Sequence, residues 1–151
     1  MTYFEDFSVG ERMRHARGKT ITDVEVATLC HLVMNTHQAH FNAQFMAATP
    51  FERPIAFGGI TAAIVVGLAM QDTGEHALAE LALSEVRFPK PVVAGDTLYA
   101  LTEVVAVEDG EDDDAGRVVF RHWGVNQDDD VVFEGRREVL VMRRSHWEER
   151  V

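Results

Sequence analysis

Cysteine, positive charge and an apolar leader are what this sequence has least of. Cys30 is the only cysteine in 151 residues, which excludes an intramolecular disulfide and suits a reducing cytoplasm. The opening residues, MTYFEDFSVGERM, contain no basic stretch followed by an apolar run, so we expect no secretory signal. With 14 basic against 25 acidic residues and a net charge of −11, the chain has no broadly basic surface. Nucleic acid is therefore not expected as its main partner.

Length and composition predict a single globular domain over residues 1–151. Hydrophobic residues make up 46% and charged residues 26% of the chain, as in ordinary soluble domains, and the length suffices for a core without disulfides or metals. From Gly58 to Met70 the only polar side chain is Thr61. That run is shorter than the about 20 residues a membrane-spanning helix needs, so no membrane partner is expected.

The first predicted helix runs from about Asp23 to about Met34. Thr22 and Glu25 have the spacing of a capping box, in which each side chain bonds the backbone of the other residue. Apolar residues follow at helical spacing as far as Val33. The polar stretch MNTHQAHFN, residues 34–42, comes directly after this helix.

A helix that is apolar on every side must be buried on every side, and residues 58–70 have that pattern. The second half of the chain predicts four consecutive strands within LSEVRFPKPVV, DTLYALTEVVAV, GRVVFRHWGVNQ and VVFEGRREVLVMRR. The acidic segments 108–116 and 128–130 are predicted to be the turns between them. Short links imply an antiparallel sheet, which would curl around the helix in an α+β hotdog fold.

Nearly the whole chain, from about Tyr3 to about Arg144, resembles the MaoC-like dehydratases, which include the (R)-specific enoyl-CoA hydratases. The segment from ITDVEVATLCHLVMNTHQAHFN to IAFGGITAAIVVGLA carries the resemblance, together with VRFPKPVVAGDTLYA. The resemblance implies a hotdog that forms a homodimer or an assembly of dimers. It also implies an acyl-CoA thioester as substrate, to which water is added or from which it is removed, with no cofactor.

The family's site motif is Asp-x-Asn-Pro-x-His, with an acidic residue two places later. In this chain Asn35 stands in the Asp place, His40 keeps the final His, and Asn42 replaces the trailing acid. Phe57-Gly58 stands where the family often has His-Gly. Branches similar to MNTNPLHF at this place imply a branched or dicarboxylic acyl group, such as that of mesaconyl-CoA.

Hydration of an α,β-unsaturated thioester needs a base for water, an acid for the α-carbon and a donor for the thioester oxygen. His40 can be acid or base, because the unperturbed pKa of histidine, about 6.5, lies near working pH. The thioester oxygen would bind backbone N–H groups of Gly58 or Gly59 at the start of the apolar helix. Asn35 cannot titrate, so we expect it to position the water while His37 shares proton transfer with His40.

The remaining residues of the predicted site have competing interpretations. Phe57 would shape the acyl pocket, and Arg53 would lie at the fringe of the site near the charged coenzyme A moiety. Asn42 is either a substrate contact or a helix cap, and His37 and His40 could each be structural. No metal site is expected, because the Cys–His stretch holds no acidic residue and no second ligand pair follows it. A nucleophilic Cys30 is not expected either, since it lies in an apolar helix.

Two other functions remain open on the same scaffold. The protein could be a catalytically degenerate hotdog that binds acyl-CoA without turnover, because Asn35, Gln38 and Phe57 all depart from the family pattern. It could also be an acyl-CoA thioesterase, although no carboxylate is evident near the start of the central helix. Fold alone does not decide among the three.

Overall fold

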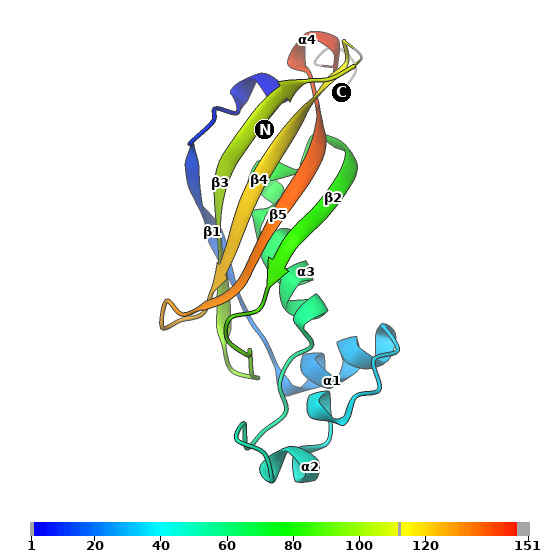
Figure 1. Ribbon diagram of the computed structural model, residues 1–151, viewed down its shortest axis with the longest axis vertical. Coiled ribbons are helices and arrows are strands. Elements are labelled where there is room, and N and C mark those ends of the chain that lie inside the picture. The colour runs from blue at the N-terminus through cyan, green and yellow to red at the C-terminus, as the bar shows by residue number, and fades with distance from the viewer. Residues whose placement is uncertain (1, 112, 148–151) are drawn as a thin grey trace.

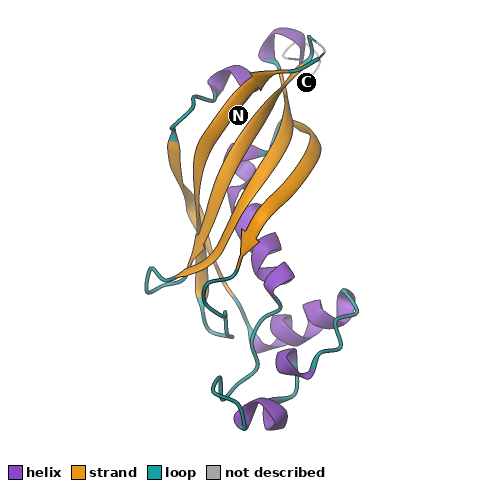
Figure 2. Cartoon of the chain, viewed as in Figure 1, coloured by secondary structure: helices purple, strands orange, loops and turns teal. Residues whose placement is uncertain are grey.

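The computed structural model describes residues 2–111 and 113–147 and has the α+β architecture expected from the sequence (Figures 1 and 2). Five antiparallel strands form one sheet in the order β1-β3-β4-β5-β2. The strands are β1 (Arg12–Thr20), β2 (Ala77–Arg87), β3 (Thr97–Asp109), β4 (Ala115–Val125) and β5 (Val131–Met142). The helices are η1 (Phe4–Asp6), α1 (Asp23–Leu32), η2 (Gln38–His40), α2 (Ala43–Ala47), α3 (Gly58–Thr73) and α4 (Arg144–Trp147).

The sheet curls around α3, which confirms the predicted arrangement of the apolar run (Figure 1). Val65 and Ala69 of α3 pack in one buried cluster with Ala100 of β3 and Phe133 of β5. Gly124 brings β4 close to the helix, because a Cβ at this position would lie 2.4 Å from a methyl group of Val65. At this cluster the contact between the helix and the sheet is therefore tight and apolar.

The prediction that α3 is buried on every side is wrong for this chain. Ile60, Val65 and Ala69 face the core, whereas Ala63 and Gly67 are exposed. The physical reason is that one curved sheet covers only one side of a helix. An uncovered helix face with small apolar side chains is left along α3.

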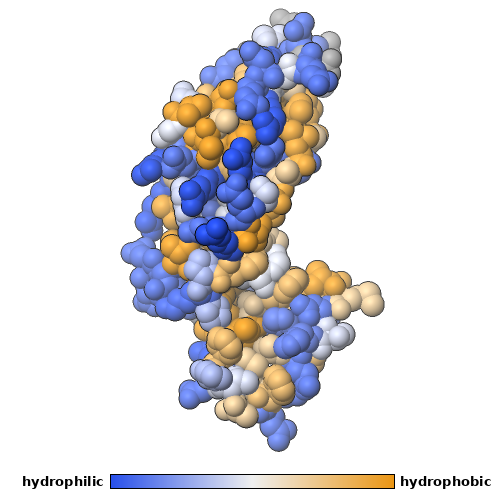
Figure 3. Space-filling model, viewed as in Figure 1, coloured by the Kyte–Doolittle hydropathy of each residue, from blue (hydrophilic) through white to orange (hydrophobic). Residues whose placement is uncertain are grey.

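Residues 21–57 form a lobe that projects from one end of the sheet and contains α1, η2 and α2 (Figure 1). The predicted capping box is confirmed, since Thr22 and Glu25 each bond the other's backbone. Helix α1 ends at Leu32, slightly earlier than predicted, and Met34 takes a left-handed backbone with φ of 57°. Apolar side chains cover much of the lobe surface (Figure 3). Those exposed on it include Val24, Leu32, Val33, Met34 and Phe45.

Three of the four predicted strands match closely, and β2 is the exception. It begins at Ala77 and ends at Arg87, whereas the sequence predicted a strand over residues 83–93. Pro89 and Pro91 lack backbone N–H groups and so cannot continue the ladder beyond Phe88. Only an isolated bridge between Val93 and Ile55 follows, and it ties this segment to the lobe.

The acidic segment 128–130 lies in the turn predicted for it, whereas only the middle of segment 108–116 is a turn, because its first two residues belong to β3 and its last two to β4. Residue 112 is outside the described residues. One segment connects β3 with β4, and the other connects β4 with β5. In the second turn, Asn126 accepts hydrogen bonds from the backbones of Asp128 and Asp130, both at 3.0 Å. None of the described helices is both long and apolar enough to cross a bilayer.

A chain of polar groups, buried except for the carboxylate of Asp72 at its end, crosses the interface between the sheet and α3. His15 Nδ1 lies 2.6 Å from the Asp72 carboxylate, and His15 Nε2 lies 2.7 Å from the hydroxyl of Thr102. The same hydroxyl lies 2.7 Å from Nδ1 of His122, whose Nε2 has no partner among the described residues. Burial, together with the nearby charge of Arg137, lowers the pKa of His122 to about 3.

This histidine predicts a specific loss of stability in acid. Because its pKa is about 6.5 in the unfolded chain and about 3 in the folded one, the unfolded state binds the additional proton between these values. The free energy of unfolding should therefore fall as pH is lowered through this window, by at most about 1 kcal/mol per pH unit from His122 alone. Urea unfolding at about pH 7, 6 and 5 should show a flatter dependence for His122→Asn than for the wild type. Parallel curves for the two proteins would contradict this assignment.

Candidate functional site

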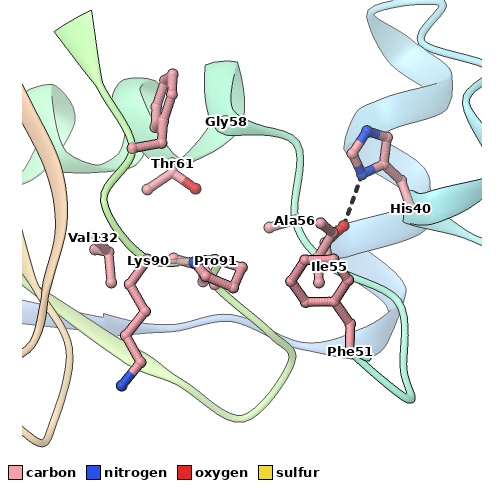
Figure 4. A pocket seen from close by; sticks show the side chains of 11 residues that line it. His40, Phe51, Ile55, Ala56, Gly58, Thr61, Lys90, Pro91 and Val132 are labelled. Atoms are coloured by element: carbon pink, nitrogen blue, oxygen red, sulfur yellow. Dashed lines mark hydrogen bonds between the residues drawn. The ribbon is translucent and has the colours of Figure 1, made fainter. Parts of the chain in front are cut away.

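A mostly apolar pocket lies where the lobe meets the start of α3. It has a volume of about 330 Å³, and the segment after β2 closes its far side (Figure 4). Three residues with polar side chains line it, namely His40, Thr61 and Lys90. The other lining residues are Phe51, Ile55, Ala56, Gly58, Phe88, Pro91, Val92 and Val132. A thioester with a short acyl chain is compatible with such a lining, because few polar groups would have to be desolvated.

His40 reaches this pocket from η2, in the polar stretch after α1. Its Nδ1 donates a hydrogen bond to the carbonyl oxygen of Ile55 at 2.8 Å (Figure 4). That bond orients the ring and holds a proton on Nδ1, so that in the neutral ring the lone pair of Nε2 is available as a base. His40 is half-buried, and its ring centroid lies 5.8 Å from that of Phe57. The geometry is that of an oriented acid–base group.

The start of α3 provides backbone donors on the same pocket. The N–H groups of Ile60 and Thr61 both donate to the carbonyl oxygen of Phe57. Gly58 and Gly59 are the first two residues of α3, so their N–H groups have no acceptor within the helix. A helix start of this kind favours negative charge. Gly58 itself lines the pocket. A Cβ there would lie 3.0 Å from the ring of Phe88, so glycine allows this ring to pack on the helix start.

Asn35 and His37 line a different hollow, an open one of about 550 Å³ on the lobe. Oδ1 of Asn35 accepts the backbone N–H of His37 at 3.1 Å. Nδ1 of His37 accepts the N–H of Ala39 at 3.2 Å and caps η2. The rings of His37 and His40 are neighbours, with centroids 5.8 Å apart. The His37–His40 pair stays a prediction, whereas Asn35 is not brought to the pocket of His40.

The other predicted site residues lie around this pocket in different roles. Asn42 caps α2, since its Oδ1 accepts the N–H of Phe45 at 3.0 Å, which is the capping alternative foreseen for it. Phe57 is the residue before α3, and its ring packs beside Gly59. Gly59 is exposed, and neither Phe57 nor Gly59 lines the pocket. Arg53 donates to the carbonyl oxygen of Ala94 at 2.8 Å, so it fastens the lobe to the turn before β3.

Sequence reasoning missed Thr61, Phe88 and Val132 as site residues. Thr61 did carry a signal, because it is the only polar side chain of an otherwise apolar helix segment. Phe88 and Val132 had none, since apolar residues next to strands usually belong to a core. Cys30 is buried, and its burial raises the pKa of the thiol, which makes it a poor nucleophile. In residues 2–111 and 113–147, no cluster of three or more His, Cys, Asp or Glu could hold a metal ion.

Comparison with known proteins agrees with the fold and with the family resemblance. The family described as mesaconyl-CoA hydratase matches residues 2–143. The mesaconyl-CoA hydratase of Haloarcula marismortui is 35% identical over 93% of this chain and 42% of its own length. The crystal structure of a MaoC domain protein dehydratase from Chloroflexus aurantiacus superposes with a TM-score of 0.90 at 32% identity, covering 95% of this chain and 41% of that one.

A conserved protein of Mycobacterium tuberculosis, described as a double hotdog, superposes with a TM-score of 0.86 at 25% identity. The match covers 97% of this chain and 46% of that one. The chain thus spans less than half the length of each of these three proteins. With a matching family over nearly all its residues and a shared hotdog, the chain belongs to the mesaconyl-CoA hydratase family of MaoC-like proteins.

Proposed function

We propose that this chain adds water to, or removes it from, an acyl-CoA thioester. The observation that supports this most directly is the position of His40, oriented by the carbonyl of Ile55, in one pocket with the start of α3. An acid–base group and an anion-stabilising helix end in one apolar cavity are the two parts that the reaction needs. Membership of the mesaconyl-CoA hydratase family supports the same reaction class.

In the proposed hydration, His40 acts first as base and then as acid, and the start of α3 stabilises the enolate. Nε2 of His40 takes a proton from water while the water oxygen forms a bond to C3 of the enoyl thioester. Electrons of the C2–C3 double bond move to the thioester oxygen, where N–H of Gly58 stabilises the enolate. The enolate then collapses and C2 accepts a proton from the imidazolium of His40, which returns the base to its neutral form. Removal of water follows the same steps in reverse.

The acyl group that we propose is short and branched or dicarboxylic, as in mesaconyl-CoA. The pocket is compact and has aromatic walls from Phe51 and Phe88, which favours a short chain. Lys90 at its rim forms an ion pair with Asp130. Its ammonium group would be the cation nearest to a second carboxylate.

We further propose that the working unit contains two hotdogs, most simply as a homodimer or an assembly of dimers in the cytoplasm. Edge strand β2 exposes Leu81 and Leu83, and the uncovered face of α3 exposes Ala63 and Gly67. A second sheet alongside β2 would pair this edge and cover these apolar groups. The greater length of the relatives, more than twice the matched part, is compatible with two such units in one chain. The unpaired Cys30 is compatible with a reducing compartment.

Among the alternatives, one observation favours binding of acyl-CoA without turnover. Asn35, which stands in the family's Asp place, lines another hollow than His40 and so does not assist it in the pocket. Thioester hydrolysis is less well supported, since neither Asp nor Glu lines the described pocket to activate water.

The hydratase proposal predicts loss of the enoyl-thioester absorbance with crotonyl-CoA or mesaconyl-CoA. His40→Asn should fold normally, because the Asn amide can still donate to the carbonyl of Ile55, yet lower kcat by about 100-fold or more through loss of the base. His37→Ala is the companion variant, and unchanged kinetics would exclude the share in proton transfer that the sequence predicted for His37. Binding of acyl-CoA by calorimetry without any turnover would favour the binding protein, and release of free CoA would favour the thioesterase.

The two-hotdog proposal predicts a mass in analytical ultracentrifugation of at least twice the 16.9 kDa of the chain. Leu83→Glu should shift the protein toward the monomer, because it places a charge at the proposed strand-to-strand contact. Val9→Glu is the matched control, since Val9 is also exposed but precedes β1 at the opposite edge of the sheet. Equal dissociation constants for the two variants would contradict the β2 contact.

A further inference from the structure

Two threonines of α3 differ in how their hydroxyl groups are bonded. Thr73 donates to the carbonyl oxygen of Ala69 at 2.8 Å and accepts a hydrogen bond from Arg137 at 2.9 Å. Thr61 is just as buried, but it makes no side-chain hydrogen bond within the part of the chain that the structure describes. Threonine inside a helix usually bonds the carbonyl four residues earlier, so the free hydroxyl of Thr61 needs an explanation.

The backbone around Thr61 accounts for the missing bond. The carbonyl four residues earlier belongs to Phe57, and it already accepts the N–H groups of Ile60 and Thr61 at 2.9 and 3.2 Å. Both lone pairs of that oxygen are therefore in use. The hydroxyl of Thr61 points instead into the pocket, on the side facing His40 (Figure 4).

The rest of the pocket lining offers few other polar side chains that could bind a water. Besides His40, the only other lining residue with a polar side chain is Lys90, whose ammonium group is paired with Asp130. Asn35, which the sequence predicted to position the water, faces the separate hollow on the lobe. Oγ1 of Thr61 is not among the fully enclosed side-chain atoms that lack a partner in the described residues, so a water or a polar atom of a ligand can reach it from the pocket.

We propose that Thr61 binds the oxygen atom that is added to, or removed from, C3 of the acyl chain. This inference rests on the proposed hydration and assigns the water-positioning role within it. The water gives one hydrogen to Nε2 of His40 and donates its second hydrogen bond to Oγ1 of Thr61. A lone pair of the water oxygen is then directed at C3. After addition, the same Oγ1 is hydrogen-bonded to the new hydroxyl group of the product.

This role predicts a particular split between kcat and KM. Thr61→Val keeps the shape of the side chain and removes the hydroxyl, so kcat for crotonyl-CoA should fall by about 10- to 100-fold with KM changed by less than about twofold. Thr61→Ser keeps the hydroxyl and is the matched control, which should retain most of the kcat. Melting temperatures of both variants near the wild-type value establish that the fold is intact.

Binding without turnover tests the same contact independently. In a His40→Asn background, calorimetry compares 3-hydroxybutyryl-CoA, which carries the C3 oxygen, with butyryl-CoA, which lacks it. Thr61→Val should weaken the first by about 3- to 10-fold and leave the second unchanged. Equal effects on both ligands, no effect on either, or a Thr61→Ser variant as impaired as Thr61→Val would overturn the proposal. A wild-type protein without turnover but with the expected binding difference would refute the hydratase function while leaving the Thr61 contact in place.

Discussion

Burial of one face of α3 against the curved sheet is the contact on which the rest of the structure depends. Gly124 allows β4 to approach Val65, and Phe133 completes the cluster on that side of the helix. Because the helix is held along its length, the position of its first residue is fixed as well. The N–H of Gly58 and the hydroxyl of Thr61 are then presented to the pocket by a rigid element, as precise chemistry requires.

The acid–base group comes from a different part of the molecule. His40 lies on the lobe and is oriented by Ile55, a residue of the segment that returns to α3. The bond from the N–H of Ile55 to the carbonyl of Ala39 at 3.0 Å closes the same connection from the other side. The site is therefore a junction, in which the sheet determines the donor end and the lobe determines the position of the base. Neither part alone contains both.

Regular patterns made most of the fold predictable, whereas the irregular segments limited what could be known of the site. The apolar run after Phe57 and the β-branched strands predicted the hotdog, and the Thr22–Glu25 spacing predicted the start of α1. Side-chain directions between Met34 and Asn42 could not be derived from periodicity. They depend on one left-handed residue and a single turn of 3₁₀-helix, which send Asn35 and His40 to different hollows. Thr61 was visible in the sequence as a polar exception, but its unused hydroxyl became meaningful only beside the occupied carbonyl of Phe57.

The lobe is expected to be less stable than the sheet, because few of its apolar side chains are buried. Helix α1 buries only Val26 and Cys30, and α2 buries only Met46, while the strands share long hydrogen-bonded ladders around the core. Segments with few buried apolar contacts open at a lower free-energy cost than the global unfolding of a protein. Amide protons of the lobe should therefore exchange with solvent ahead of those in β4 and β5. His40 belongs to this lobe, whereas Gly58 and Thr61 belong to α3, so local opening of the lobe would take the base out of the site while the core stays folded.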